Sequence, residues 1–280
     1  MISLVADTTC GLPLEKLYAL GIEVLPQLIV FGNETYRDDT EIDTETFIRK
    51  LRSPGPMPKT AAPPPALYNP IYEKLLAKSE TILVIAPSGD VSGTARSAAV
   101  AAQDFPGADI RVIDTRTVAG GLGSIILKAH QLIRDGIDAD TLEAYVKAMA
   151  ARETLYFVVD TLEQLYKGGR IGGAKALFGS LLQIKPILTL KNGQVQPFET
   201  ERTKRRALAR VQDLVLKECP ADPGAYLTVS HCDAYDEARV FADSFKHALA
   251  IPEVPIYLVP PAIVVHAGPR LIEVSFFRSN

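Results

Sequence analysis

The sequence predicts an α/β fold of two domains, in which a parallel sheet with covering helices precedes a mixed α+β sheet. In the first half of the chain, short apolar runs typical of strands alternate with helical patterns. In the second half, a hairpin signal with an Asn192-Gly193 turn precedes a basic helix and further strands. A chain of 280 residues is long enough for two domains of ordinary size. We place the boundary at Arg152, which gives domains 1–152 and 153–280.

The first half alternates predicted strands with predicted helices. The strands are Ile2–Ala6, Ile22–Phe31 with a bend at Pro26, Thr81–Ala86 and Ile110–Asp114. The helices are Leu14–Leu20, Asp43–Arg52, Ala66–Lys78, the pattern that starts at Thr94, and Gly123–Asp135. In parallel sheets, ligands bind at the carboxyl ends of the strands. Three polar loops follow such strands, and we expect them to converge on one crevice: Asp7-Thr8-Thr9, Ser88–Thr94 and Asp114–Thr117.

The second half contains more strands and fewer crossover helices. The predicted strands are Leu155–Val159, Pro186–Lys191, Gln194–Glu199, Tyr226–Ser230, Ile256–Val259, Pro261–Val265 and Leu271–Phe277. The predicted helices are Ala139–Ala150, a helix that ends at Gly168-Gly169, Ala174–Lys185, Arg202–Lys217, and one between the strands at 226–230 and 256–259.

A proline-rich stretch, Ser53–Pro65 (SPGPMPKTAAPPP), separates two of the predicted helices. Proline lacks a backbone N–H and fixes φ, so the stretch is not expected to form a regular element. Two interpretations stay open. The stretch is a plain linker, or it is a stiff loop that holds Thr60 in a defined position.

The composition is that of a globular protein without a strong charge bias. The apolar fraction is 47%, the charged fraction 22%, and the formal net charge −3. The sequence has no surplus of basic residues and no helix-turn-helix signal, so it does not favour nucleic-acid binding. The N-terminal MISLVADTTCGLP lacks the features of a secretion signal, and no apolar stretch is long enough to span a bilayer. We therefore expect a cytoplasmic location and no integral membrane segment.

The cysteines and histidines give no metal or disulfide pattern. Cys10, Cys219 and Cys232 form no Cys-x-x-Cys pair, and the four histidines include no close pair at ligand spacing. The acidic pair Asp38-Asp39 is interpreted as a solvated loop. We predict no metal site.

The loop SGDVSGTARSA, residues 88–98, opens a helix and is rich in serine and glycine. Free N–H groups and hydroxyls at a helix start favour an anionic oxygen. The loop matches neither Gly-x-x-x-x-Gly-Lys-Ser/Thr nor Gly-x-Gly-x-x-Gly. Three interpretations stay open: an anion site, helix capping by Ser88 and Ser92, or a nucleophilic Ser92.

His266 precedes a Gly268-Pro269 turn and is a candidate to orient a ligand oxygen or to act as a base. An ordinary loop histidine is the alternative. Together with Ser92 it would form a nucleophile–base pair, although no Gly-x-Ser-x-Gly elbow is present. Arg170 and Arg202 each lie beside a turn and are candidates to bind a phosphate or the acidic face of a partner.

Several motifs occur in a fixed order that resembles the DegV family of fatty-acid-binding proteins, which includes the acyl-carrier subunit of bacterial fatty acid kinase. The resemblance runs nearly end to end. The motifs are Asp7-Thr8-Thr9, Pro58-Lys59-Thr60, Ser92-Gly93-Thr94, Asp114-Thr115, Asp160-Thr161-Leu162-Glu163, Lys167-Gly168-Gly169-Arg170-Ile171-Gly172, Ile184-Lys185-Pro186-Ile187-Leu188, Arg202-Thr203 and His266-Ala267-Gly268-Pro269.

The resemblance implies two α/β domains that enclose an apolar tunnel at and beside their interface, with a long-chain fatty acid inside. Carried over residue by residue, it assigns the fatty-acid carboxylate to Thr60, Ser92, Gly93, Thr94 and His266. It assigns head-group or partner contacts to three arginines, Arg170, Arg202 and Arg270.

The implied role is non-catalytic, with no cofactor besides the bound lipid. A separate fatty acid kinase transfers phosphate from ATP to the presented carboxylate, and the carrier holds the acyl phosphate. The alternative is a hydrolase of acyl esters or acyl phosphates that uses Ser92 and His266.

The sequence departs from the family pattern at two places. It has Thr60-Ala61-Ala62-Pro63 where the family often has Thr-Ser-Gln-Pro, so a hydroxyl and an amide are missing. It has Gly268-Pro269-Arg270 where the family commonly has Gly-Pro-Gly. We expect Arg270 to reshape the head-group site or to add a counter-charge there.

Overall fold

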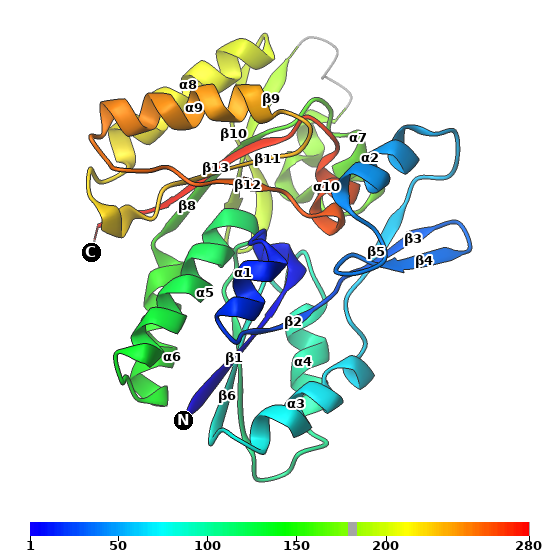
Figure 1. Cartoon of the computed structure of the whole chain (residues 1–280). Coiled ribbons are helices and arrows are strands. Elements are labelled where there is room, and N and C mark those ends of the chain that lie inside the picture. Colours follow the sequence, from blue (N-terminus) through cyan, green and yellow to red (C-terminus); the bar gives the residue numbers. More distant parts are fainter. Residues whose placement is uncertain (179–183, 280) are drawn as a thin grey trace.

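The computed structural model describes residues 1–178 and 184–279, and it contains one large sheet in each half of the chain (Figure 1). The predicted α/β fold of two domains is confirmed. Helix α6 (Ala139–Ala151) ends, and strand β8 (Glu153–Val158) begins, on either side of Arg152. The domain boundary at that residue stays a prediction.

The N-terminal sheet is parallel, as predicted, with the strand order β2-β1-β6-β7. Its strands are β1 (Ile2–Asp7), β2 (Glu23–Leu25), β6 (Thr81–Ala86) and β7 (Asp109–Asp114). The helices α1 (Leu14–Ala19), α3 (Asn69–Leu76) and α4 (Thr94–Ala102) lie between these strands in the chain, and α5 (Ala119–Arg134) follows β7. Short 3₁₀ helices lie at Thr8–Cys10 and Pro65–Leu67.

Helices cover both faces of this sheet because its strands are apolar on both sides. Leu4 and Ala6 of β1 pack in a cluster with residues of α1, α5 and α6. Val5, between them, packs on the opposite face with Tyr68 and Tyr72, at the start of α3, and with alanines of α4. The alternation of side chains along a strand produces these two layers.

The C-terminal sheet is mixed, with the strand order β10-β9-β8-β13-β11-β12. Only β11 and β12 pair in parallel; the other neighbours are antiparallel. The further strands are β9 (Lys185–Lys191), β10 (Gln194–Glu201), β11 (Thr228–His231), β12 (Ile256–Leu258) and β13 (Ile272–Phe277). One face packs on helices α8 (Lys204–Glu218) and α9 (Tyr235–Ala248), and the other faces the first domain (Figure 1). A 3₁₀ helix, Pro223–Ala225, precedes β11.

A third sheet of three strands, which the sequence did not predict, lies beside the domain interface. It consists of β3 (Leu28–Phe31), β4 (Glu34–Arg37) and β5 (Lys59–Ala61), and helix α2 (Thr44–Arg52) follows β4. The single strand predicted at 22–31 is therefore wrong, because Pro26 separates β2 from β3 and the two join different sheets. Thr60 lies in β5 opposite Ile29 rather than in a loop.

The strand predicted at Pro261–Val265 is also wrong, because the segment forms helix α10 (Pro261–Ala267). Its β-branched residues favour a strand, but Pro261 occupies the first helical turn, where a missing N–H has no cost. Gly268, with φ +82°, ends the helix. Helix α10 packs against α7 (Glu163–Lys167).

The helix predicted at Ala174–Lys185 is only partly found. A 3₁₀ helix covers Gly172–Leu177, and residues 179–183 lie outside the described part of the chain. Lys185 belongs to strand β9, because it pairs with Glu201 of β10. Helix α5 begins four residues earlier than predicted, at Ala119 instead of Gly123.

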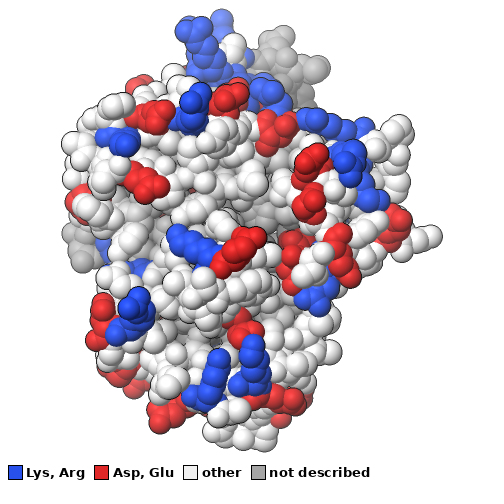
Figure 2. Space-filling model, in the orientation of Figure 1, with Lys and Arg blue, Asp and Glu red and all other residues white. Residues whose placement is uncertain are grey.

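The surface carries charges of both signs. On the face drawn in Figure 2, Lys and Arg side chains are interspersed with Asp and Glu side chains. Within residues 1–178 and 184–279, no helix is both long and apolar enough to cross a membrane.

The turn between β9 and β10 docks on the first domain. Ser88 Oγ donates to the carbonyl of Gly193 at 2.7 Å, and Arg116 donates to the carbonyl of Asn192. Gln194 Nε2 donates to Asp90 Oδ1 at 3.1 Å. The hairpin thus fastens the second sheet to the loop that precedes α4.

We expect Gly193→Ala to lower the free energy of unfolding by about 2–3 kcal/mol, measured by urea denaturation. Gly193 has φ +80°, and an added Cβ would lie 2.5 Å from Ser88 Oγ. Gly136→Ala is the matched control, because Gly136 has φ +86° but no atom within 4 Å of an added Cβ. The control should cost only the strain of the backbone, about 1 kcal/mol. Equal losses in the two variants would contradict the docked turn.

Candidate functional site

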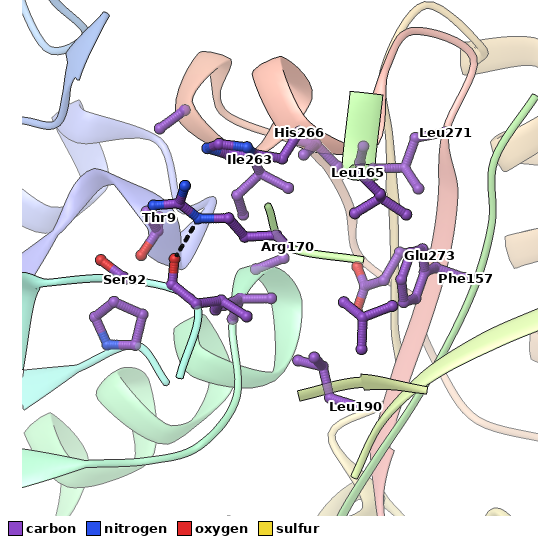
Figure 3. A pocket seen from close by; sticks show the side chains of 18 of the residues that line it. Thr9, Ser92, Phe157, Leu165, Arg170, Leu190, Ile263, His266, Leu271 and Glu273 are labelled. Carbon is purple, nitrogen blue, oxygen red and sulfur yellow. Dashed lines mark hydrogen bonds between the residues drawn. The ribbon is translucent and has the colours of Figure 1, made fainter. Parts of the chain in front are cut away.

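A pocket of about 110 Å³ lies where the carboxyl ends of the parallel strands face the C-terminal sheet (Figure 3). Most of its lining is apolar and comes from the second domain. Apolar side chains from β8, α7, β9 and α10 surround the space, among them Leu155, Phe157, Leu165, Leu190 and Ile263. A pocket of this kind accommodates hydrocarbon and excludes water.

Polar side chains from five separate segments line one side of the pocket. Thr9 follows β1, Gln27 follows β2, and Ser92 precedes α4. Thr60 comes from β5 and His266 from α10. Figure 3 shows Thr9, Ser92 and His266 around one end of the pocket, away from Phe157 and Leu190.

The orientation of Ser92 depends on a buried hydrogen-bond network that starts at Asp7. The Asp7 carboxylate accepts from Gln27 Nε2 at 2.6 Å and from Thr94 Oγ1 at 2.9 Å. Thr94 Oγ1 is in turn 2.9 Å from Ser92 Oγ. Thr94 gives its hydroxyl hydrogen to the carboxylate, so the Ser92 hydroxyl is left as the donor that turns between Thr94 and the pocket.

Two of the predicted polar loops therefore meet through the bond between Asp7 and Thr94. The third joins them because the Ser88 amide donates to the carbonyl of Thr117 at 2.9 Å. The three loops therefore meet, but the expected convergence on one crevice is confirmed only for the first two, which line the pocket through Thr9, Val91 and Ser92; no residue of Asp114–Thr117 lines it.

Burial raises the pKa of Asp7 to about 6, although hydrogen bonds from Thr9, Thr94 and Gln27 oppose the shift. Burial also raises the pKa of Asp38 to about 7. Asp38 is 9% exposed, and it accepts from Thr8 Oγ1 at 2.8 Å and from the backbone N–H of Gln27 at 2.8 Å. Our interpretation of Asp38-Asp39 as a solvated loop was wrong, because Asp38 is a buried partner of the β1 loop.

His266 and Thr60 form a second polar pair at the same end of the pocket. Thr60 Oγ1 and His266 Nε2 are 2.7 Å apart. Burial, and to a smaller extent the positive charge of Arg170, lowers the pKa of His266 to about 4. The imidazole is therefore neutral at neutral pH, and its second nitrogen, Nδ1, forms no hydrogen bond with a described residue.

Arg170 brings a positive charge to this end of the pocket. Its Nε donates to the carbonyl of Val91 at 3.2 Å, the bond drawn in Figure 3, and its Nη1 donates to the carbonyl of Gly168 at 2.6 Å. The side chain thus links the loop before α4 to the second domain and is held beside the polar groups.

The structure brings Thr60, Ser92, Arg170 and His266 together, but it leaves other predicted site residues outside the pocket lining. Gly93 forms the N-cap of α4, and Thr94 supports Ser92 from behind. Arg202 is exposed before α8. Arg270 forms ion pairs at 3.3 Å with Asp160 and Glu237, which places its charge on the surface.

The capping interpretation of the serine loop is supported for Ser92 and not for Ser88. Ser92 Oγ accepts from the backbone N–H of Thr94, the first residue of α4, at 3.3 Å, whereas Ser88 donates to the hairpin turn. Ser92 is hydrogen-bonded to Thr94, and His266 to Thr60, so these two residues do not form a hydrogen-bonded nucleophile–base pair. Among the described residues, no three His, Cys, Asp or Glu side chains cluster as metal ligands would.

Two polar residues of the pocket lining escaped the sequence analysis. Gln27 carries no motif of its own, since it is a lone amide between two strands. Glu273 lines the pocket and is 3% exposed. A signal existed for Glu273, because it is the only charged residue in the otherwise apolar or small run 271–277.

The chain matches a family model described as "Uncharacterised protein, DegV family" over residues 1–279. It is 31% identical to a DegV domain-containing protein of Halalkalibacterium halodurans, over 99% of this chain and 98% of that one. Solved structures that resemble this chain include the following two. One is DegV of Bacillus subtilis, described as a fatty acid binding protein, with TM-score 0.89, 29% identity and 99% coverage of both chains. The other is a fatty acid binding DegV family protein of Thermus thermophilus, with TM-score 0.88, 28% identity and 99% coverage of both.

We expect the Asp38→Asn variant to lose less stability than the unchanged protein when the pH is raised. In the folded chain the pKa of Asp38 is about 7, above its ordinary value of 3.8. Between these values the folded state binds the proton and the unfolded state does not, so stability falls as pH rises from about 4 to about 7. In the variant, the decrease in the free energy of unfolding over this pH range should be smaller by on the order of 1–3 kcal/mol, measured by urea unfolding at a series of pH values.

Asp39→Asn is the matched control for this measurement. Burial raises the pKa of Asp39, but hydrogen bonds from Arg37 outweigh it and the pKa is lowered overall. In this control, the free energy of unfolding should still decrease between pH 4 and pH 7, as it does in the unchanged protein. An unchanged fall in Asp38→Asn would show that Asp38 does not titrate in this range.

Proposed function

This chain belongs to the DegV family, and we propose that it binds a long-chain fatty acid with its hydrocarbon tail in the apolar pocket. The carboxylate would lie at the polar end, against Ser92, Thr60 and His266. The observation that supports this most strongly is the division of one pocket into an apolar wall and a single end with convergent hydroxyls.

The division of the pocket into an apolar wall and a polar end suits the binding energetics of a long-chain fatty acid. Burial of about 14 methylene groups contributes on the order of 11 kcal/mol, so the polar end needs only to orient the carboxylate. That the pocket extends into a tunnel for the whole tail is part of the proposal.

The hydrogen-bond network supplies donors for the carboxylate. A neutral His266 with its proton on Nε2 donates to Thr60 Oγ1, which frees the threonine hydrogen for the ligand. This tautomer leaves the unpaired Nδ1 as an acceptor, which is less costly than a buried N–H without a partner. Ser92 provides the second donor, and Arg170 provides a compensating charge.

We further propose that the chain is a non-catalytic carrier in the cytoplasm that presents the carboxylate to a separate fatty acid kinase. The kinase would transfer phosphate from ATP, and the carrier would hold and release the acyl phosphate. The chain has no Walker-type phosphate loop of its own. The low pKa of His266 makes it a weak general base, which argues against the alternative hydrolase.

Arg202 is the exposed residue that we assign to the kinase interface. It precedes Thr203, the residue that caps α8 through its hydroxyl. A cation at this position can meet an acidic partner or an acyl phosphate without a change in the pocket.

We expect Ser92→Ala and Thr60→Ala each to weaken fatty-acid binding about tenfold, because each removes one hydrogen bond to a charged group. The measurement is titration calorimetry on lipid-free protein, after native mass spectrometry has identified any co-purified fatty acid. Ser88→Ala is the control from the same loop, and it should leave affinity unchanged because Ser88 contacts the hairpin turn instead. Unchanged affinity in both pocket variants would refute the head-group assignment.

We expect Arg202→Glu to reduce acyl phosphate formation by a partner kinase at least tenfold while fatty-acid affinity stays the same. The assay follows ATP-dependent phosphorylation of bound fatty acid in a mixture with the kinase. Arg134→Glu is the control, since Arg134 is an exposed residue in the last turn of α5. Equal turnover by Arg202→Glu and the unchanged carrier would remove Arg202 from the interface.

A further inference from the structure

Glu273 is a buried carboxyl on the wall of the pocket that the carboxylate site does not use. It lies in β13 between Phe157 of β8 and Ser230 of β11, and it is 3% exposed. Figure 3 shows its carboxyl directed from β13 toward the pocket, on the side opposite Thr9 and Ser92. It therefore faces the part of the pocket that would contain the hydrocarbon tail.

Neither carboxyl oxygen of Glu273 forms a hydrogen bond with a described residue. Ser230, Ser275 and the Gly120 amide lie close enough to lower its pKa, but burial prevails and raises the pKa to about 7. The Ser230 hydroxyl, which is 1% exposed, is also without a hydrogen-bond partner. Both carboxyl oxygens of Glu273 and the Ser230 hydroxyl thus lack a partner in hydrogen-bond geometry, although Ser230, Ser275 and the Gly120 amide lie close to the carboxyl.

Such atoms are costly to bury without a hydrogen bond, and a purely hydrocarbon ligand would leave them unsatisfied. A second carboxylate on the ligand fits poorly, because Glu273 and the neighbouring Glu153 already disfavour negative charge there: burial and Glu273 raise the pKa of Glu153 to about 8. A hydroxyl fits either state of the glutamate, since it donates to a carboxylate and accepts from a carboxylic acid.

We propose that Glu273 forms a polar subsite for a hydroxyl group on the ligand's hydrocarbon chain, so that the protein prefers a hydroxy fatty acid to the unsubstituted acid of the same length. This inference rests on the proposed binding of a fatty acid and names the substrate class. Ser230, opposite Glu273 in the strand pair, does not line the pocket and lies behind the Glu273 carboxyl.

The test is a comparison of stearic acid with a series of hydroxystearic acids whose hydroxyl lies near the carboxyl end, in mid-chain or at the terminal carbon. Affinities are measured by displacement of a fluorescent fatty acid from lipid-free protein. We expect one isomer with a distal or mid-chain hydroxyl to bind about tenfold more tightly than stearic acid, because it satisfies a buried group. Isomers with the hydroxyl elsewhere should bind more weakly than that one.

Variants test whether Glu273 causes the preference for a hydroxy fatty acid over the unsubstituted acid. Glu273→Leu should abolish it and tighten the binding of stearic acid, whereas Glu273→Gln, of the same shape and still polar, should retain a preference. Ser124→Ala is the control: Ser124 of α5 is 5% exposed and does not line the pocket. It should leave the preference unchanged, and urea unfolding of each variant verifies folding.

The possible outcomes separate the two proposals. If stearic acid binds as tightly as every hydroxylated isomer, the subsite is wrong and the proposed function stands. If Glu273→Leu keeps the preference, a different residue contacts the hydroxyl. If no fatty acid binds at all, the proposed function fails and this inference fails with it.

Discussion

The first turns of helix α5 pack against both large sheets, and the position of the pocket depends on this close contact. A Cβ at Gly120 would lie 2.4 Å from Thr228 Oγ1, and one at Gly121 would lie 2.4 Å from Glu153 Oε1. Toward the first domain, a Cβ at Gly123 of α5 would lie 2.7 Å from the carbonyl of Cys10. Only glycine permits this approach. Val118 and Ala119, directly before these glycines, become part of the pocket lining.

This arrangement accounts for the concentration of buried carboxyls around the interface. Asp7 and Asp38 support the polar end of the pocket, and Glu153 and Glu273 lie beside the start of α5. Burial raises the pKa of all four, so each destabilises the fold when it is ionised. Proteins retain such groups where ligand binding needs a pre-arranged polar surface, and pKa shifts of this kind are concentrated at functional sites.

The predictions from sequence were most successful where a local rule acts. Strands followed by helices indicated the parallel sheet, and the Asn192-Gly193 turn indicated the β9–β10 hairpin; both residues have positive φ, as such a turn requires. The predictions from sequence failed at Pro26 and Pro261, where proline has opposite effects on the local structure. One proline ended a strand and the other began a helix, and a single residue does not distinguish these outcomes before its neighbours are placed.

The sequence by itself determined the order of the elements, the family, and the residue types at the polar end of the pocket, because hydrophobic periodicity and motif order are local properties of the chain. Only the tertiary structure decided which of these residues meet. Thr60 and His266 are separated by 206 positions and are in contact, whereas Arg202 and Arg270 lie outside the pocket. Gln27 and Glu273 had no motif; strand register turns Glu273 toward the pocket, and the segment between β2 and β3 places Gln27 there. Register and domain docking are long-range packing effects, and no local pattern encodes them.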